Sequence, residues 1–291
     1  MRDQAQKLRE LAQNKELTSD PVRRVSHHCR SIAITSGKGG VGKTTLSLTL
    51  AGAIAKLQKR VLLMDVDLGL ANVHILLGMA PKYNVSNFIS GQCSLDQTVV
   101  QTPEGISLVP GASGLEELAN LDTARLERLR LDFLKLENRY DFLVMDTGAG
   151  IGSMVTHFSS HADLTLLVMT PDPTSLADAY AMVKVLYEKG AAQIGVVVNM
   201  VSNEREGRET FDRLNALVVR FLKKPLELFG VIVSDRDIQR FGRMQNLLRI
   251  DNSHNRFMHR TTMLARKICG GGPVTKNSFF SRFFNRINPE V

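Results

Sequence analysis

Short runs of apolar and β-branched residues recur along the chain and are separated by longer stretches with helical spacing. A short apolar run that is bounded by polar residues is typical of a strand. Runs without alternation predict strands that are buried on both faces, as in a parallel sheet. The predicted strands cover residues 32–34, 61–64, 106–109, 142–145, 164–169, 194–198 and 230–233.

Four longer segments place apolar residues three and four positions apart, which is the spacing of a helix with one face on a sheet. They cover residues 43–57, 124–136, 175–187 and 209–222. Thr174 or Ser175 is expected to cap the third helix. Strands that alternate with helices predict an α/β fold with a doubly wound, mostly parallel sheet flanked by helices.

Three glycines and a proline at residues 270–273 interrupt this pattern, because these residues do not continue a helix. We therefore expect one large domain over residues 30–270. A segment with a linker precedes it at residues 1–29, and a linker with a helix follows at 271–291. A chain of 291 residues is long enough for one such domain with a well-buried core.

Composition narrows the class of protein. No apolar run is long enough to cross a bilayer, and residues 1–16 lack the layout of a secretion signal, so we expect a cytoplasmic, soluble or peripheral protein. Cys29, Cys93 and Cys269 form no CxxC pair, which argues against a disulfide framework or a cysteine-built metal site. The formal charge of +8 permits anionic partners without selecting one. Residues 235–267 hold eight Arg or Lys against three Asp, which is either a contact surface or a solvated helical face.

A phosphate-binding motif follows the first predicted strand. Residues 37–44 fit GxxxxGK[ST] and lead directly into the first predicted helix, which is the context that the motif requires. Glycine N–H groups and the helix N-terminus favour phosphate, Lys43 reaches the terminal phosphates, and the Thr44 hydroxyl is placed to ligate Mg²⁺. The predicted nucleotide site comprises Gly37, Lys38, Gly39, Gly40, Val41, Gly42, Lys43, Thr44 and Thr45.

Acidic residues follow two of the predicted strands. Asp65 and Asp67 come after the strand at 61–64, and Asp146 comes after the strand at 142–145. The carboxyl ends of parallel strands meet at the edge that carries the phosphate site. Asp146 is expected to hold Mg²⁺ through water, and the glycines that follow it permit a loop that responds to the γ-phosphate. The alternative for Asp65 and Asp67 is an ordinary helix-capping role.

Lys38 comes directly after the first glycine of the motif, where a generic P-loop needs no lysine. The loop GKGGVGKTT resembles the variant P-loop of the MinD/ParA ATPases, and the resemblance covers residues 31–267. It implies an ATP-dependent homodimer in which Lys38 reaches the partner subunit's nucleotide. It also implies that Asp67 orients the attacking water and that Asp65 lies nearer to the metal. A cation beside the β- and γ-phosphates would offset the charge that such a dimer buries.

The resemblance places Asn199, at the end of the strand at 194–198, beside the nucleotide base. An asparagine amide matches the N6 and N7 edge of adenine. A guanine reader of the NKxD type needs lysine and aspartate where Met200 and Ser202 stand, so the sequence favours ATP over GTP. Val233 stands where the family commonly has proline.

Three stretches, DLGLAN at 67–72, VPGASG at 109–114 and TPDPTSLADAY at 170–180, resemble the flagellar-number regulators FlhG and FleN. This resemblance implies a switch that hydrolyses ATP slowly and controls the number and placement of flagella. Its implied partners are the GTPase FlhF and a flagellar master transcription activator, and direct DNA binding is not expected. The alternatives are a MinD/ParA-like ATPase of cell division or DNA partition, and a P-loop kinase or ligase.

The N-terminal stretch DQAQKLR is similar to the element by which these regulators stimulate FlhF. Asp3, Gln4, Ala5, Leu8 and Arg9 match that element. The resemblance implies that Gln4 lies near the catalytic water of the GTPase. Taken without the resemblance, this stretch would be a weakly helical, solvated tail.

The C-terminal stretch at 277–288 predicts an amphipathic helix. At about 100° per residue, one face carries its aromatic and aliphatic side chains. These are Phe279, Phe280, Phe283, Phe284 and Ile287. With arginines at its flanks, the face suits a helix that lies reversibly in an anionic membrane surface at the inner side of the cytoplasmic membrane. The alternative is a helix folded back onto its own domain or onto a partner.

Overall fold

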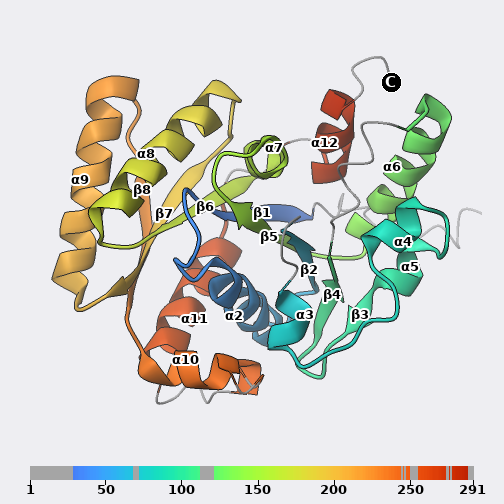
Figure 1. The fold of residues 1–291 in the computed structure, drawn as a ribbon, viewed down its shortest axis with the longest axis horizontal. Coiled ribbons are helices and arrows are strands. Elements are labelled where there is room, and N and C mark those ends of the chain that lie inside the picture. Colours follow the sequence, from blue (N-terminus) through green and yellow to red (C-terminus); the bar gives the residue numbers. More distant parts are fainter. Residues whose placement is uncertain are drawn as a thin grey trace, which may run out of the picture.

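The computed structural model describes residues 29–67, 72–111, 121–243, 245, 247–249, 255–272, 275 and 277–287. Helices cover both faces of an eight-stranded sheet (Figure 1). The strand order is β3-β4-β2-β5-β1-β6-β7-β8, and all neighbours run parallel except β3 and β4. The predicted fold class, a doubly wound and mostly parallel α/β sheet, is confirmed.

Every predicted strand is present, and several extend further at one or both ends. The strands are β1 (Arg30–Ser36), β2 (Val61–Val66), β3 (Val100–Gln101), β4 (Ile106–Val109), β5 (Phe142–Ala149), β6 (Leu164–Met169), β7 (Ile194–Val201) and β8 (Glu227–Val233). The extensions carry polar residues such as Asp146 and Asn199, which the apolar pattern does not mark. The short strand β3 was not predicted, because two half-exposed residues carry no periodicity.

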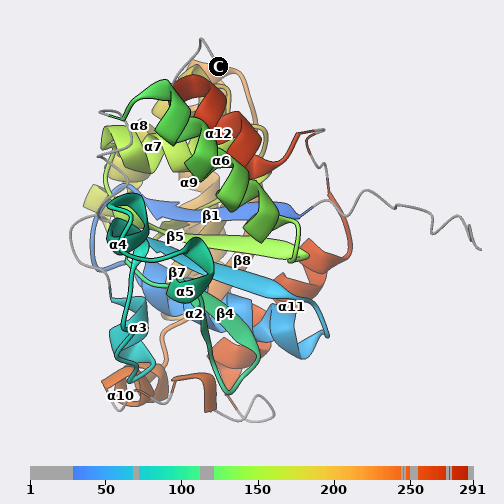
Figure 2. The same ribbon diagram turned by 90° about the vertical axis from the view of Figure 1, so that its right-hand side faces the viewer.

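The helices form two layers, one on each face of the sheet (Figures 1 and 2). They are α2 (Lys43–Lys56), α3 (Val73–Leu76), α4 (Val85–Ile89), α5 (Leu95–Thr98), α6 (Thr123–Glu137), α7 (Ser153–His161), α8 (Pro173–Glu188), α9 (Glu204–Leu222), α10 (Arg236–Arg243), the 3₁₀ turn η2 (Leu247–Arg249), α11 (Arg256–Cys269) and α12 (Phe279–Ile287). On one face α2 and α11 pack together, and on the other lie α6, α7, α8, α9 and α12. Within the described residues, no helix combines the length and the apolarity needed to span a membrane.

Strand β1 shows how the pattern builds both layers. Successive side chains of a strand point to opposite faces. Ile32 and Ile34 therefore join the core under α2 and α11, and Ala33 joins the core under α6 and α7. All three are fully buried, which explains why the run lacks alternating polar residues.

Helix α8 begins two residues earlier than expected, at Pro173. Its cap is Asp172, whose side chain accepts a hydrogen bond from the Ser175 N–H at 3.1 Å. The expectation that Thr174 or Ser175 caps this helix is therefore wrong. Asp followed by Pro is a common helix start, because the carboxylate caps and proline is well suited to the first turn.

Helix α12 lies against α6 and α7, and its phenylalanines point into the domain. The exposed fractions of Phe279, Phe280, Phe283 and Phe284 are 0%, 1%, 1% and 2%. Phe280 stacks on Phe133 with ring centroids 4.6 Å apart, and Phe283 lies 4.5 Å from Phe158. Each buried ring contributes roughly 1.5–3 kcal/mol. In this structure the expected membrane-facing surface is thus part of the core, as in the alternative of a helix folded back onto its domain; the side chain of Ile287 is not described.

Two buried carboxylates hold the start of α12 and the segment before it. Glu137 accepts hydrogen bonds from the first two N–H groups of α12 at 2.8 and 3.1 Å. Asp163 accepts from the Thr275 N–H and from the Arg282 guanidinium, both at 3.0 Å. Burial acts to raise the pKa of Asp163, but hydrogen bonds from Thr275 and Ser31 and the charge of Arg282 hold this pKa below its usual value.

Candidate nucleotide-binding site

The loop between β1 and α2 has the geometry that the phosphate motif requires. Gly40 and Gly42 have φ angles of 78° and 88°, in the left-handed region that favours glycine. A Cβ at Gly42 would lie 2.5 Å from Nδ2 of Asn199. No side chain caps α2, and its first turn holds no acidic residue. The N-terminus of α2 is therefore open to an anion.

Two of the predicted carboxylates lie side by side at the end of the sheet next to this loop. Asp65 of β2 and Asp146 of β5 are paired in register and are 0% and 1% exposed. The Ser47 hydroxyl of α2 donates to Asp146 at 2.8 Å. Burial raises the pKa of Asp146 to about 7 and that of Asp65 to about 6. Both groups are buried carboxylates that a nearby positive charge would stabilise.

Asp67 and Lys43 belong to the same cluster. Lys43 is only 8% exposed. Burial lowers its pKa, although the negative charges of Asp146 and Asp67 act to raise it. A Cβ at position 148, two residues after Asp146, would lie 3.3 Å from Oδ1 of Asp67. Glycine at this position therefore leaves room for the Asp67 carboxylate. The structure thus brings together the predicted lysine and the three predicted aspartates.

The donor set fits a magnesium ion. The Thr44 hydroxyl lies close enough to the buried Asp146 carboxylate to lower its pKa, and both side chains offer oxygen atoms to a metal. Among the described residues, no group of three or more His, Cys, Asp or Glu side chains is arranged to hold a metal alone. Magnesium is commonly held by one or two protein oxygens together with waters and nucleotide phosphates. A divalent cation here would also compensate the burial of Asp146.

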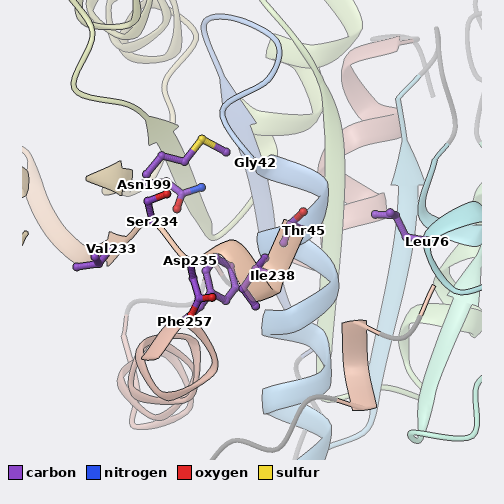
Figure 3. Close-up of a pocket in the computed structure, with 10 residues that line it drawn as sticks. Gly42, Thr45, Leu76, Asn199, Val233, Ser234, Asp235, Ile238 and Phe257 are labelled. Atoms are coloured by element: carbon purple, nitrogen blue, oxygen red, sulfur yellow. The ribbon is translucent and has the colours of Figure 1, made fainter. Parts of the chain in front are cut away.

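A cavity of about 370 Å³ opens beside the loop (Figure 3). It is lined by Gly42, Thr45, Leu76, Asn199, Met200, Val233, Ser234, Asp235, Ile238 and Phe257. Asn199 is 3% exposed, and its Nδ2 donates to the Val41 carbonyl at 2.8 Å. Asp235 is held by Asn255, whose Nδ2 donates to Oδ2 at 3.0 Å. The cavity is apolar with a few convergent polar groups, which is typical of a site for a base.

Lys38 is held by its own chain. Its Nζ lies 2.5 Å from Oδ1 of Asp172 and 2.9 Å from Oγ1 of Thr174. The hydrogen bond from Lys38 lowers the pKa of Asp172 well below its usual range. Sequence reasoning missed Asp172, although Asp before Pro at the start of a helix was a usable signal. The expected contact of Lys38 with a partner subunit stays a prediction.

The N-terminal residues predicted to activate a partner, Asp3, Gln4, Ala5, Leu8 and Arg9, lie outside the described residues. Residues 68–71 and 112–120 also lie outside them, within or beside two of the stretches that resemble FlhG and FleN. The third stretch, at 170–180, forms the loop after β6 and the first half of α8. It supplies Asp172 and Thr174 to the mouth of the loop.

Fold and site together define a P-loop protein of the nucleotide-binding class. Residues 32–247 match the family described as CobQ/CobB/MinD/ParA nucleotide binding domain, and the chain belongs to this family.

An antiactivator and a flagellum site-determining protein are among its relatives. The chain is 41% identical over 215 residues to the antiactivator FleN of Pseudomonas aeruginosa, which covers 74% of this chain and 77% of FleN. It is 34% identical over 219 residues to the flagellum site-determining protein YlxH of Helicobacter pylori, with 75% and 74% covered. A chain of the MinC:MinD cell division protein complex of Aquifex aeolicus matches with a TM-score of 0.68 at 26% identity, covering 86% of this chain and 99% of that one. The predicted resemblance to FlhG/FleN-like MinD/ParA ATPases is confirmed.

Proposed function

We propose that the protein is a slow, magnesium-dependent ATPase that dimerises on binding ATP and regulates the number and placement of flagella. The observation that carries this proposal is the P-loop with Lys38 at its mouth, in a chain similar to FleN and YlxH. One relative is named a flagellum site-determining protein and the other an antiactivator. Those names support a flagellar role and a transcription activator as one partner.

The side chains around the loop have the chemistry that hydrolysis needs. Lys43 would bind the terminal phosphates, and Thr44 with Asp146 would hold magnesium, which supplies positive charge beside the phosphates. Asp67 is partly exposed and would orient the attacking water. Asp65 accepts hydrogen bonds from the N–H groups of Asp67 and Val73, both at 3.2 Å, so it would position the loop that carries Asp67.

Lys38 would act on the nucleotide of a second subunit after exchanging its present partner. Its ion pair with Asp172 joins side chains that are 32% and 44% exposed. Such surface pairs contribute about 0.2–1 kcal/mol, whereas a hydrogen bond to a charged group contributes about 1.5–3 kcal/mol. A buried γ-phosphate would therefore outcompete Asp172 for Lys38. This difference would link dimerisation to the presence of ATP.

The two ends of the chain would carry the output. The segment with Gln4 would stimulate an FlhF-like GTPase, as the sequence resemblance implies. Reversible association with an anionic membrane would require α12 to leave α6 and α7. Its rings would then exchange burial in the core for burial in lipid, which offsets part of the apolar cost, while Phe133 and Phe158 on the domain would lose the rings that cover them. The polar contacts of Glu137 and Asp163 would be lost.

Two substitutions test the proposal. Lys38→Ala should stay monomeric in ATP and magnesium, and Asp67→Ala should accumulate as a dimer because it cannot hydrolyse ATP. Sedimentation velocity measures both, with the exposed Lys82→Ala as a control. Normal dimer formation by Lys38→Ala would reject the proposed role of this lysine. In cells, loss of the protein should change the number of flagella; a change in plasmid or chromosome inheritance with normal flagella would favour a partition ATPase instead.

A further inference from the structure

Helix α11 presents a basic surface to solvent that nucleotide binding does not use. Its exposed positions are Arg256, His259, Arg260, Met263, Arg266 and Lys267. The helix contains no Asp or Glu. Its inner side, including Phe257 and Leu264, is buried in the core beneath the sheet. Helix α11, whose place in the fold is seen in Figure 1, therefore concentrates cations on a single exposed side.

A hollow of about 600 Å³ lies beside the first turns of this helix. Arg256, His259 and Arg260 line one side of it, and Asn203 and Glu204 at the start of α9 line the other. Arg260 already binds the Glu204 carboxylate. Within the described residues, Arg256 pairs with no carboxylate. In this hollow Arg260 thus binds a carboxylate of its own chain, whereas Arg256 can accept a carboxylate from a ligand.

The surface continues beyond the hollow along α11. Arg266 also has no carboxylate partner in the described part of the chain. It lies ten residues after Arg256, or about 15 Å at the helical rise. Between the two, Met263 is 49% exposed. The pattern is therefore two open guanidinium groups with an apolar side chain between them.

We propose that this face of α11 docks an acidic polypeptide segment of a protein partner. One partner carboxylate binds Arg256 in the hollow, a second binds Arg266, and an apolar side chain covers Met263. The charges at the sides of the face favour a polypeptide over a nucleic acid. Glu204 pairs with Arg260, and Glu227 pairs with Lys267 at 2.8 Å.

These two glutamates place negative charge beside the docking face. A phosphate backbone carries a charge at every nucleotide and would meet both of them. A polypeptide can place neutral residues opposite the glutamates and carboxylates opposite the arginines. It can also supply the apolar group that Met263 lacks. The same helix lines the base cavity through Phe257, so a docked segment would lie about one helix diameter, 10–12 Å, from the nucleotide site.

The test measures binding of a short fluorescent peptide of Glu and Asp residues around a central Leu, by anisotropy, to the full-length chain. The paired substitution Arg256→Gln with Arg266→Gln should weaken binding by about 2- to 30-fold. A control pair, Lys82→Gln with Lys223→Gln, removes the same net charge from exposed positions elsewhere and should have less than about a twofold effect. Thermal unfolding of both pairs should match the unsubstituted chain, because all four side chains are exposed.

Equal weakening by the two pairs would overturn the proposal, because only net charge would then matter. The proposal would also be overturned if the α11 pair weakened binding of a labelled DNA duplex more than binding of the peptide. Met263→Ser should weaken binding of the peptide that has the central Leu. It should not change binding of a peptide that has Gly in place of this Leu. The assay contains no nucleotide, so a failure of ATP hydrolysis would count against the proposed function and not against this surface.

Discussion

The ion pair between Lys38 and Asp172 makes a quantitative prediction about dimerisation. Asp172→Asn removes the charge that holds Lys38 at 2.5 Å but keeps a side-chain oxygen for the Ser175 N–H. Asparagine caps helices about as well as aspartate, so α8 should keep its start. The substitution therefore changes the hold on Lys38 with little change to the fold.

The size of the effect follows from the exposure of the pair. Side chains that are 32% and 44% exposed form a surface ion pair, which contributes about 0.2–1 kcal/mol. A dimer must break this pair in both subunits, for a total of about 0.4–2 kcal/mol. Asp172→Asn should then tighten the ATP-bound dimer by about 2- to 30-fold.

Sedimentation velocity over a range of protein concentrations measures the dissociation constant of the dimer. The measurement uses an Asp67→Ala background, which prevents ATP turnover. Asp132→Asn is a matched control: it breaks a surface pair with Lys135 at 3.1 Å, and its side chain is also 44% exposed. It should leave the dimer unchanged. An unchanged or weaker dimer for Asp172→Asn would refute the idea that Asp172 competes for Lys38.

Three further changes test other parts of the structure. Gly42→Ala places a Cβ 2.5 Å from Asn199 at a φ of 88°, and it should abolish nucleotide binding measured by calorimetry. Gly230→Ala is the control: its Cβ meets nothing within 4 Å, so this variant should bind nucleotide normally. Magnesium binding needs the ionised form of Asp146, whose pKa is about 7. Magnesium affinity should therefore fall by about tenfold per pH unit below pH 7 and level off above about pH 8. A flat pH profile would exclude Asp146 as a ligand. Phe280→Ala should lower the free energy of unfolding by about 3–5 kcal/mol, whereas the 58% exposed Phe221→Ala should change it by about 0.5 kcal/mol or less. Equal effects would mean that α12 is not docked in solution.

Local patterns predicted the sheet and the loop well. The predicted strand segments before and after the P-loop, 32–34 and 61–64, are apolar without interruption, and the motif itself is contiguous, so no distant contact was needed to recognise either. Asp65 and Asp146 were predictable because parallel strands end at a common edge.

Contacts between distant residues were not predictable in the same way. Lys38 and Asp172 are separated by 134 positions, and nothing near either residue indicates the other. The aromatic face of α12 is the same pattern whether it meets lipid or Phe133 and Phe158. Helix α11 was not among the predicted helices, because the basic residues at 235–267 indicated only a contact surface or a solvated helical face without bounds. In each case tertiary packing, and not local propensity, decided the outcome.

The docking of α12 also bears on how the protein is made. Synthesis runs from the N-terminus, so α6 and α7 emerge long before α12. Until α12 is added, Phe133 and Phe158 lack the rings that cover them in the finished fold. Uncovered aromatic surface of this kind promotes aggregation and attracts chaperones. Folding of this domain is therefore complete only after residues 279–287 have left the ribosome, and a chain cut short at the glycine run would expose the same surface permanently.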